Sequence, residues 1–125
     1  MGKSKVLTLF ASAQKTATAT GTGQNLISSV GAVTGAKEGY FNRAVVNVNM
    51  SAFNGTATLD FTLESRNAAG TWFTLNPLTA WTSFTGTVEQ SRQYEGPLGE
   101  ELRGIMTFTS GTPTVTFEAT AQVIE

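Results

Sequence analysis

Two residue types are missing from this sequence: none of its 125 residues is a histidine or a cysteine. Without cysteine there is no disulfide framework, and without either residue there is no zinc site of the usual kinds. Without histidine, a nucleophilic serine or threonine would need a lysine or an amino terminus as its activating base. We therefore expect no catalytic residues, no metal, no cofactor and no enzymatic activity.

Charged residues are also scarce, at 14% of the sequence, against the roughly 25% typical of soluble domains. The formal net charge is −1, which provides no electrostatic footprint for nucleic acid. No apolar run approaches the length needed to span a bilayer, so we expect no membrane partner. Threonine, the commonest residue, takes the place of the missing charges, and its branched side chain favours strands.

The first residues imitate a signal peptide without meeting its requirements. Lys3 and Lys5 are basic, and Ala11–Ala13 resembles a cleavage site, but the apolar stretch from Val6 to Phe10 is too short and contains Thr8. We expect instead a basic N-terminal arm over residues 1–5. A single domain would then cover residues 6–125, a length sufficient for a genuine core.

What the sequence does contain is a repeated phrase in which a turn opens a strand. Gly55 and Gly111 each begin a Gly-Thr-x-Thr phrase that continues with an aliphatic residue, a polar residue and phenylalanine. Glycine supplies the positive φ of a tight turn, and the alternation that follows gives a strand with one dry and one wet face. The repeat predicts an all-β fold with two equivalent strands, which we expect to be neighbours in one sheet.

Alternation elsewhere extends this prediction to seven to nine strands. Turns every ten or so residues favour an antiparallel β-sandwich resembling a jelly roll, and no segment shows a sustained helical period. The clearest strand is 58–66, in which Leu59, Phe61 and Leu63 point inward. The strands expected are 5–10, 43–50, 58–66, 71–75, 101–109 and 114–124, with 14–20 and 24–29 as further candidates and with 81–84 and 87–93 forming one strand or two. A loop is expected over 29–39.

The acidic residues form no evident site. Asp60 and Glu64 are expected on the outward, solvated face of one strand. Glu100 and Glu101 are adjacent, so an extended chain directs them to opposite faces, and no calcium-binding loop pattern includes them or Glu95. A structural role explains these carboxylates better than catalysis or calcium binding.

Large aromatic side chains are the remaining candidates for contact with a partner or with other copies of the chain. Trp72, Trp81 and Phe84 surround a short hairpin region. Exposed, they would stack on sugar rings or anchor a protein partner. Buried, they would belong to the core, with Trp72 and Phe73 on opposite sides of one strand.

Taken together, the turn and strand motifs resemble those of small β-sandwich proteins from the head gene module of tailed bacteriophages, the capsid decoration or cement proteins. The resemblance covers almost the whole chain, and it is carried by 7–13, 16–18, 44–48, 55–65, 70–72, 102–103 and 111–117. The segments 29–40 and 77–99 are less familiar.

This resemblance implies a structural virion protein, made in the host cytoplasm, that decorates the outside of a capsid and stabilises it. Its partners would be the major capsid protein and itself, as a homotrimer, and Lys3 and Lys5 would contact the capsid. An alternative is a carbohydrate- or receptor-binding β-sandwich module of a phage tail or baseplate. Trp72 and Trp81 distinguish the two, because a sugar site requires them side by side and exposed.

Overall fold

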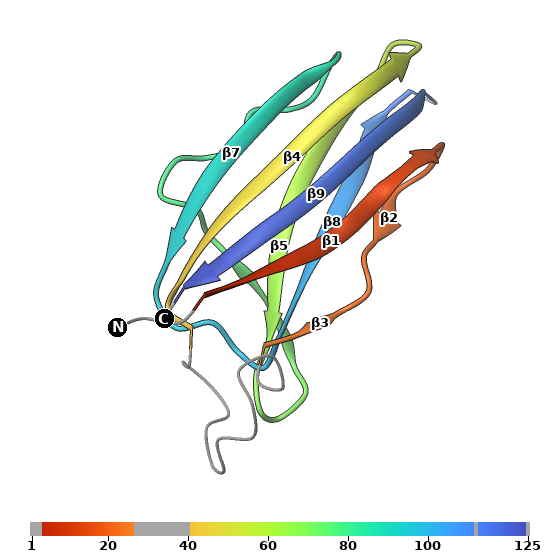
Figure 1. Ribbon diagram of the computed structural model, residues 1–125. Coiled ribbons are helices and arrows are strands. Elements are labelled where there is room, and N and C mark those ends of the chain that lie inside the picture. The colour runs from red at the N-terminus through yellow and green to blue at the C-terminus, as the bar shows by residue number, and fades with distance from the viewer. Residues whose placement is uncertain (1–3, 27–40, 112, 125) are drawn as a thin grey trace.

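The computed structural model describes residues 4–26, 41–111 and 113–124, and these contain no helix. Nine strands form two antiparallel sheets that face each other across one core (Figure 1). The strands are β1 Ser4–Lys15, β2 Ala19–Thr20, β3 Gln24–Asn25, β4 Arg43–Asn54, β5 Thr58–Arg66, β6 Trp72–Leu75, β7 Val88–Glu95, β8 Glu101–Ser110 and β9 Thr114–Ile124. The loop expected over 29–39 lies outside the described residues. Within the described residues, the prediction of an all-β sandwich is confirmed.

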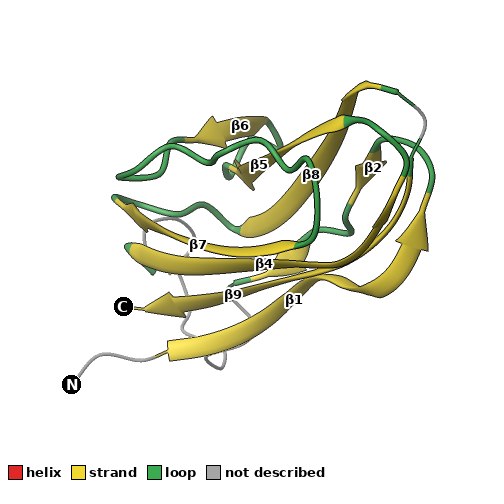
Figure 2. Ribbon diagram, turned by 90° about the horizontal axis from the view of Figure 1, so that it is seen from above, coloured by secondary structure: helices red, strands yellow, loops and turns green. Residues whose placement is uncertain are grey.

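The order of the strands in the sheets is that of a jelly roll. One sheet has the order β1-β9-β4-β7, and the other has β2-β8-β5-β6, with β3 also paired to β8. The first and last strands are therefore neighbours, and the chain passes repeatedly from one sheet to the other (Figure 2). Apart from β3, this arrangement of four strands in each layer is the double Greek key of jelly-roll domains.

Strict alternation in the sequence places the core between the sheets. In β5, Leu59, Phe61 and Leu63 are buried, while their neighbours in the strand are only partly so. The inward side chains of β9 and β4 are buried in the same way, and they are Val115, Phe117, Ala119, Ala121, Val123, Ala44, Val46, Val48 and Met50. The bounds expected for β5 and β9 are confirmed, because nothing interrupts the period of two in either strand.

The first strand differs from its prediction. It begins at Ser4, so Ser4 and Lys5 belong to the sandwich rather than to a separate arm, and it continues to Lys15. Its register with β9 shifts between Thr8 and Phe10 and again between Phe10 and Ala13. These bulges break the alternation and hide the second half of the strand from a pattern search. The expected strand 14–20 is in fact the end of β1 and the short β2.

The two strands that follow the repeated glycine phrase are not neighbours, contrary to prediction. Gly55 joins β4 to β5 and Gly111 joins β8 to β9, so each turn carries the chain between the two sheets. Both glycines have positive φ, 104° and 72° respectively, as their turn role requires. The turns touch: a Cβ on Gly111 would lie 2.1 Å from the carbonyl oxygen of Thr56. The repeat therefore encodes paired arches between sheets.

One sandwich edge is closed by a segment that we call the strap, residues 76–87. A strand expected over 81–84 is absent there; instead Phe84 forms an isolated bridge with Leu59, in which each amide donates to the other carbonyl. The amide of Leu78 donates to the carbonyl of Gln93 in β7, over 2.8 Å. The strap thus spans from β5 to β7. No helix in the described part of the chain is long and apolar enough to cross a membrane.

Candidate interaction surfaces

The predicted contact residues lie in several different environments. Lys3 lies outside the described residues. Lys5 lies in β1, opposite Val123 of β9, and is partly buried. Because β1 is an edge strand, Lys5 and Lys15 stand at the border of the four-stranded sheet. Neither lysine forms an ion pair with another described residue.

Phe84 and Trp81 pack into the sandwich, so neither forms an exposed platform. Phe84 is fully buried, at 0% exposure. The Trp81 ring packs edge-on against Phe61 at 5.0 Å between centroids, and its indole N–H donates to the Tyr94 hydroxyl over 2.6 Å. Burial raises the pKa of Tyr94 to about 12, so this hydroxyl stays neutral over the ordinary pH range. The Arg92 guanidinium covers the Trp81 ring at 5.4 Å.

Trp72 lies on the outer face of the five-stranded sheet, which is the side opposite Trp81. The guanidinium carbon of Arg103 lies 3.9 Å from the centre of the Trp72 ring. Glu64 holds the same guanidinium, accepting from Nε at 2.9 Å and from Nη2 at 2.7 Å. A cation stacked on indole and paired with a carboxylate is fixed in place. Trp72 and Trp81 therefore do not form the side-by-side pair that a sugar site requires.

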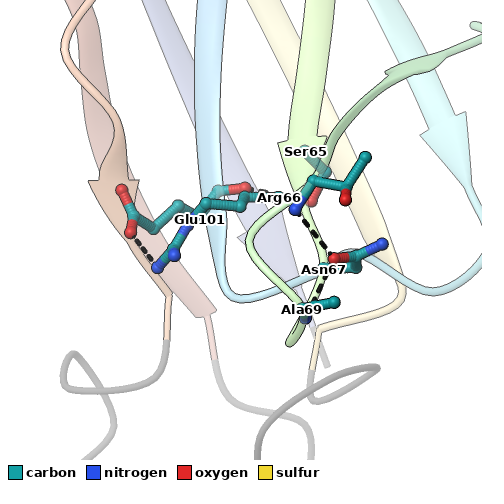
Figure 3. Close-up of polar contacts among 6 residues, drawn as sticks. Ser65, Arg66, Asn67, Ala69 and Glu101 are labelled. Atoms are coloured by element: carbon teal, nitrogen blue, oxygen red, sulfur yellow. Dashed lines mark hydrogen bonds and ion pairs between the residues drawn. The ribbon is translucent and has the colours of Figure 1, made fainter.

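A second ion pair extends this outer face toward the end of the sheet. Arg66 of β5 pairs with Glu101 of β8, directly across the two strands (Figure 3). Behind them, the buried Ser65 hydroxyl donates to the Glu101 carbonyl at 2.9 Å and accepts from the Gly99 amide at 2.7 Å. The next turn is fixed by Asn67, whose side-chain oxygen accepts from the amides of Ala69 and Thr71. Arg66 and Arg103 on this face are thus each neutralised by a glutamate.

The outer face of the four-stranded sheet has a different character, with short and mostly uncharged side chains. One row across the strands is Thr8, Thr120, Asn47 and Ser91, and the next is Val6, Gln122, Val45 and Gln93. Ser91 donates to Asn47 at 2.6 Å, and Asn47 donates to Glu89 at 2.9 Å, so part of the row is ordered. Charges lie only near the ends, as Arg43 and Glu95 at one end and Glu89 and Glu118 at the other. We call this surface the four-stranded face.

The acidic residues considered from sequence are dispersed. Asp60 accepts a hydrogen bond from the Ser83 hydroxyl, while Glu64 and Glu101 are each paired with an arginine. Glu95 lies opposite Arg43. Within the described ranges, no three side chains of the metal-binding kinds gather closely enough to hold an ion. Asp60 and Glu64 lie on the outward face of β5, as expected, but the Glu64 side chain is only 18% exposed because it is paired with Arg103.

Comparisons with known proteins give likeness of fold. No family model matches the sequence, and no curated protein matches it either. A crystal structure of the SPBc2 prophage-derived protein YomS matches with a TM-score of 0.55 and 14% identity, over 100% of this chain and 96% of that one. A chain of the T13 particle of infectious bursal disease virus matches with a TM-score of 0.59 and 11% identity, over 98% of this chain. The VP2 subviral particle of that virus gives 0.58 and 10%, also over 98%.

These neighbours share the sandwich to different extents of their own chains. The match spans nearly the whole prophage-derived protein but only 31% and 32% of the two viral chains. At such low identities the likeness establishes the fold alone. The structural neighbours of this chain thus include a prophage-derived protein and proteins of viral particles.

Sequence reasoning missed two features of these surfaces. The stack of Arg103 on Trp72 joins residues of β8 and β6, which are not adjacent in the sheet, so no local pattern reveals it. The four-stranded face was visible only in part, as the polar positions that alternate with Val46 and Val48. The sequence did not show that β1, β9, β4 and β7 would place their polar positions in rows across one sheet.

Proposed function

We propose that this protein is a structural component of a tailed-bacteriophage virion and that it coats the outside of the capsid by binding the lattice of the major capsid protein. It acts without catalysis, and copies associate as a homotrimer. The resemblance of its motifs to decoration proteins supports this proposal. So does the jelly-roll fold that it shares with a prophage-derived protein along nearly the full length of both chains.

The observation that carries the proposal is the four-stranded face. Four strands at a spacing of about 4.8 Å form a surface roughly 20 Å wide, along which most central side chains are Thr, Ser, Asn, Gln or Val. A surface of that kind approaches a neighbouring subunit closely without like-charge repulsion. Each contact is weak, and repetition over a lattice supplies the avidity.

The direct test is co-sedimentation of the purified protein with mature, empty capsids of the phage whose head it would coat. We expect saturable binding at micromolar protein, and decorated capsids that survive heating better than bare ones, because a ligand specific to the intact lattice stabilises it. Replacing Asn47 by Arg, at the centre of the four-stranded face, should weaken sedimentation. Replacing Thr74 by Arg, on the opposite sheet, is the matched control and should not.

Failure to bind capsids, combined with binding to a cell-surface glycan, would replace this proposal by the tail or baseplate module. The mass of the isolated protein in solution tests the homotrimer separately. A monomer at micromolar concentration would remove the trimer from the proposal without removing capsid binding.

A further inference from the structure

The four sheet edges are treated very differently in this sandwich. An edge strand presents unpaired amides and carbonyls, which are a template for another strand. The β7 edge is covered by the strap: Gln90 exchanges two hydrogen bonds with the backbone of Thr82, and Arg92 donates to the carbonyl of Ala80. At the edges of the other sheet, β2 and β3 have two residues each and β6 has four. Among the strands of the described residues, only β1 offers a long uncovered edge.

The usable part of that edge is Ser4–Thr8. Its register with β9 is regular up to Thr8, where the first shift begins. Beyond it, Gly21 approaches so closely that a Cβ there would lie 2.5 Å from the carbonyl oxygen of Leu9. Among the described residues, no strand pairs with the free side of Ser4–Thr8. In its middle stands Val6, the most exposed large hydrophobic side chain described, at 68%.

A groove continues from this edge along the second half of β1. It has a volume of about 360 Å³, and β1 forms one wall while residues 20–24 form the other. Thr8, Thr20, Thr22 and Gln24 line it with hydroxyl and amide groups, and Lys15 stands among them. Edge and groove together therefore form one extended track along β1.

The positive charge of this track favours an acidic occupant. Both lysines of the described chain, Lys5 and Lys15, lie in β1, and the strand contains no acidic residue. The described arginines, by contrast, are mostly engaged: Arg66 and Arg103 in ion pairs and Arg92 with backbone carbonyls. Pairing of β1 with β1 of a second copy would bring like charges together, which is unfavourable across strands.

We propose that β1 binds an extended, acidic polypeptide segment of another protein, which adds a strand beside Ser4–Thr8 and continues toward Lys15. Backbone hydrogen bonds would supply affinity, and carboxylates near the two lysines would supply specificity. In the virion proposed above, the segment belongs to the capsid protein, and in that respect alone the inference rests on the proposed function.

The test uses the full chain and two synthetic peptides, so that it does not depend on capsids. One is a capped peptide of 12 residues, the length of β1, so that it reaches from Lys5 to Lys15; it alternates Glu or Thr with Val, and the other has Lys in place of each Glu. We expect the acidic peptide to slow amide hydrogen exchange in β1 and not in β7. Its affinity should exceed that of the basic peptide about tenfold, since two cross-strand charge pairs together contribute on that order.

A charge-swapped variant separates recognition from folding. Lys5→Glu combined with Lys15→Glu should reverse the preference, so that the basic peptide binds better, an outcome that a merely unfolded variant cannot give. Arg43→Glu, a change of the same kind on β4, should leave the preference as it is. Val6→Asp should weaken the acidic peptide, and Val88→Asp, at an exposed valine of the opposite edge strand, should not.

Equal affinity for both peptides, or unchanged exchange in β1, would overturn the proposal. The same exchange experiment with empty capsids distinguishes it from the proposed function. Capsid binding without protection of β1 would leave decoration standing and remove the strand site. Peptide binding with protection of β1, but no capsid binding, would do the reverse.

Discussion

At the scale of single residues, the core depends on aromatic rings that pack together in the space between the two sheets. Phe117 of β9 packs edge-on against Phe10 of β1, with 5.1 Å between ring centroids. Gly104 in β8 leaves space for Phe10 and for Phe61 of β5, because a Cβ at this position would lie 2.8 Å from Phe61 and 3.1 Å from Phe10. A larger residue at 104 would therefore have to displace both rings, which links one glycine to the packing of both layers.

Truncating these rings should be costly. Replacing Phe61 or Phe117 by Ala is expected to lower the free energy of unfolding by about 3–5 kcal/mol, because each change leaves a cavity in a packed core. Phe73→Ala is the control: that ring is 36% exposed, so its loss should cost much less. Urea denaturation measures all three. A cost below about 1 kcal/mol at both buried positions would show that their faces are wrongly assigned.

At the scale of elements, the strap is the segment whose position depends most on side chains. One backbone bond, from the amide of Leu78 to the carbonyl of Gln93, joins it to β7. Its other attachments to β7 are the two hydrogen bonds between the Gln90 side chain and the backbone of Thr82, the Arg92 bond to Ala80 and the indole bond from Trp81 to Tyr94. Only one backbone bridge, at Phe84, joins it to β5. Most of the hydrogen bonds that hold the strap beside β7 thus come from side chains, whereas a paired strand would be held by backbone groups.

The bond between Trp81 and Tyr94 can be measured by a double-mutant cycle. Trp81→Phe leaves the buried Tyr94 hydroxyl without its donor, Tyr94→Phe removes the acceptor, and the double variant removes both. The coupling free energy is expected to be about 1 kcal/mol, the net contribution of a typical hydrogen bond. Urea unfolding of the four proteins gives it. Additive effects of the two changes would mean that this bond does not hold the strap.

Individual elements could be predicted from the sequence where alternation is uninterrupted, as in β5 and β9. Prediction failed where a bulge interrupts β1 and where Phe84 contributes only one bridge instead of a strand. It failed most clearly for the repeated phrases at Gly55 and Gly111. The turns were predicted correctly, but the strands that follow them lie in different sheets and not side by side in one. Alternation specifies that one face is buried, whereas the choice of neighbouring strand depends on contacts far apart in the chain.

The contact residues could be predicted least. Trp72, Trp81 and Phe84 are similar in sequence context, yet one lies on an outer face and the other two pack inward. Lys5 was expected where the arm enters the first strand, and its position at a sheet edge depends on pairing with Val123, at the other end of the chain. Exposure of an aromatic or a lysine is a property of the assembled sandwich, which local composition does not determine.

At the scale of the whole molecule, stability should come from the apolar core and strand pairing, with no bound ion. We expect a chelator to leave the melting temperature unchanged, since Asp60, Glu64 and Glu101 are already satisfied by protein partners. Differential scanning calorimetry with and without EDTA is the measurement. A clear drop in melting temperature on adding the chelator would reveal a cation site involving Glu95, Glu100 or another acidic residue.

The pairing of Ser4 with Ile124 has a mechanical consequence. The start of β1 and the end of β9 lie side by side, and the bonds between antiparallel strands run perpendicular to them. A pull that separates these two points therefore loads the ladder one rung at a time, as in opening a zipper, instead of shearing all rungs together. Tension applied through the two ends would peel β1 away from β9 at low force. The same load applied at the paired arches of Gly55 and Gly111, each of which joins the two sheets, would act on both sheets together.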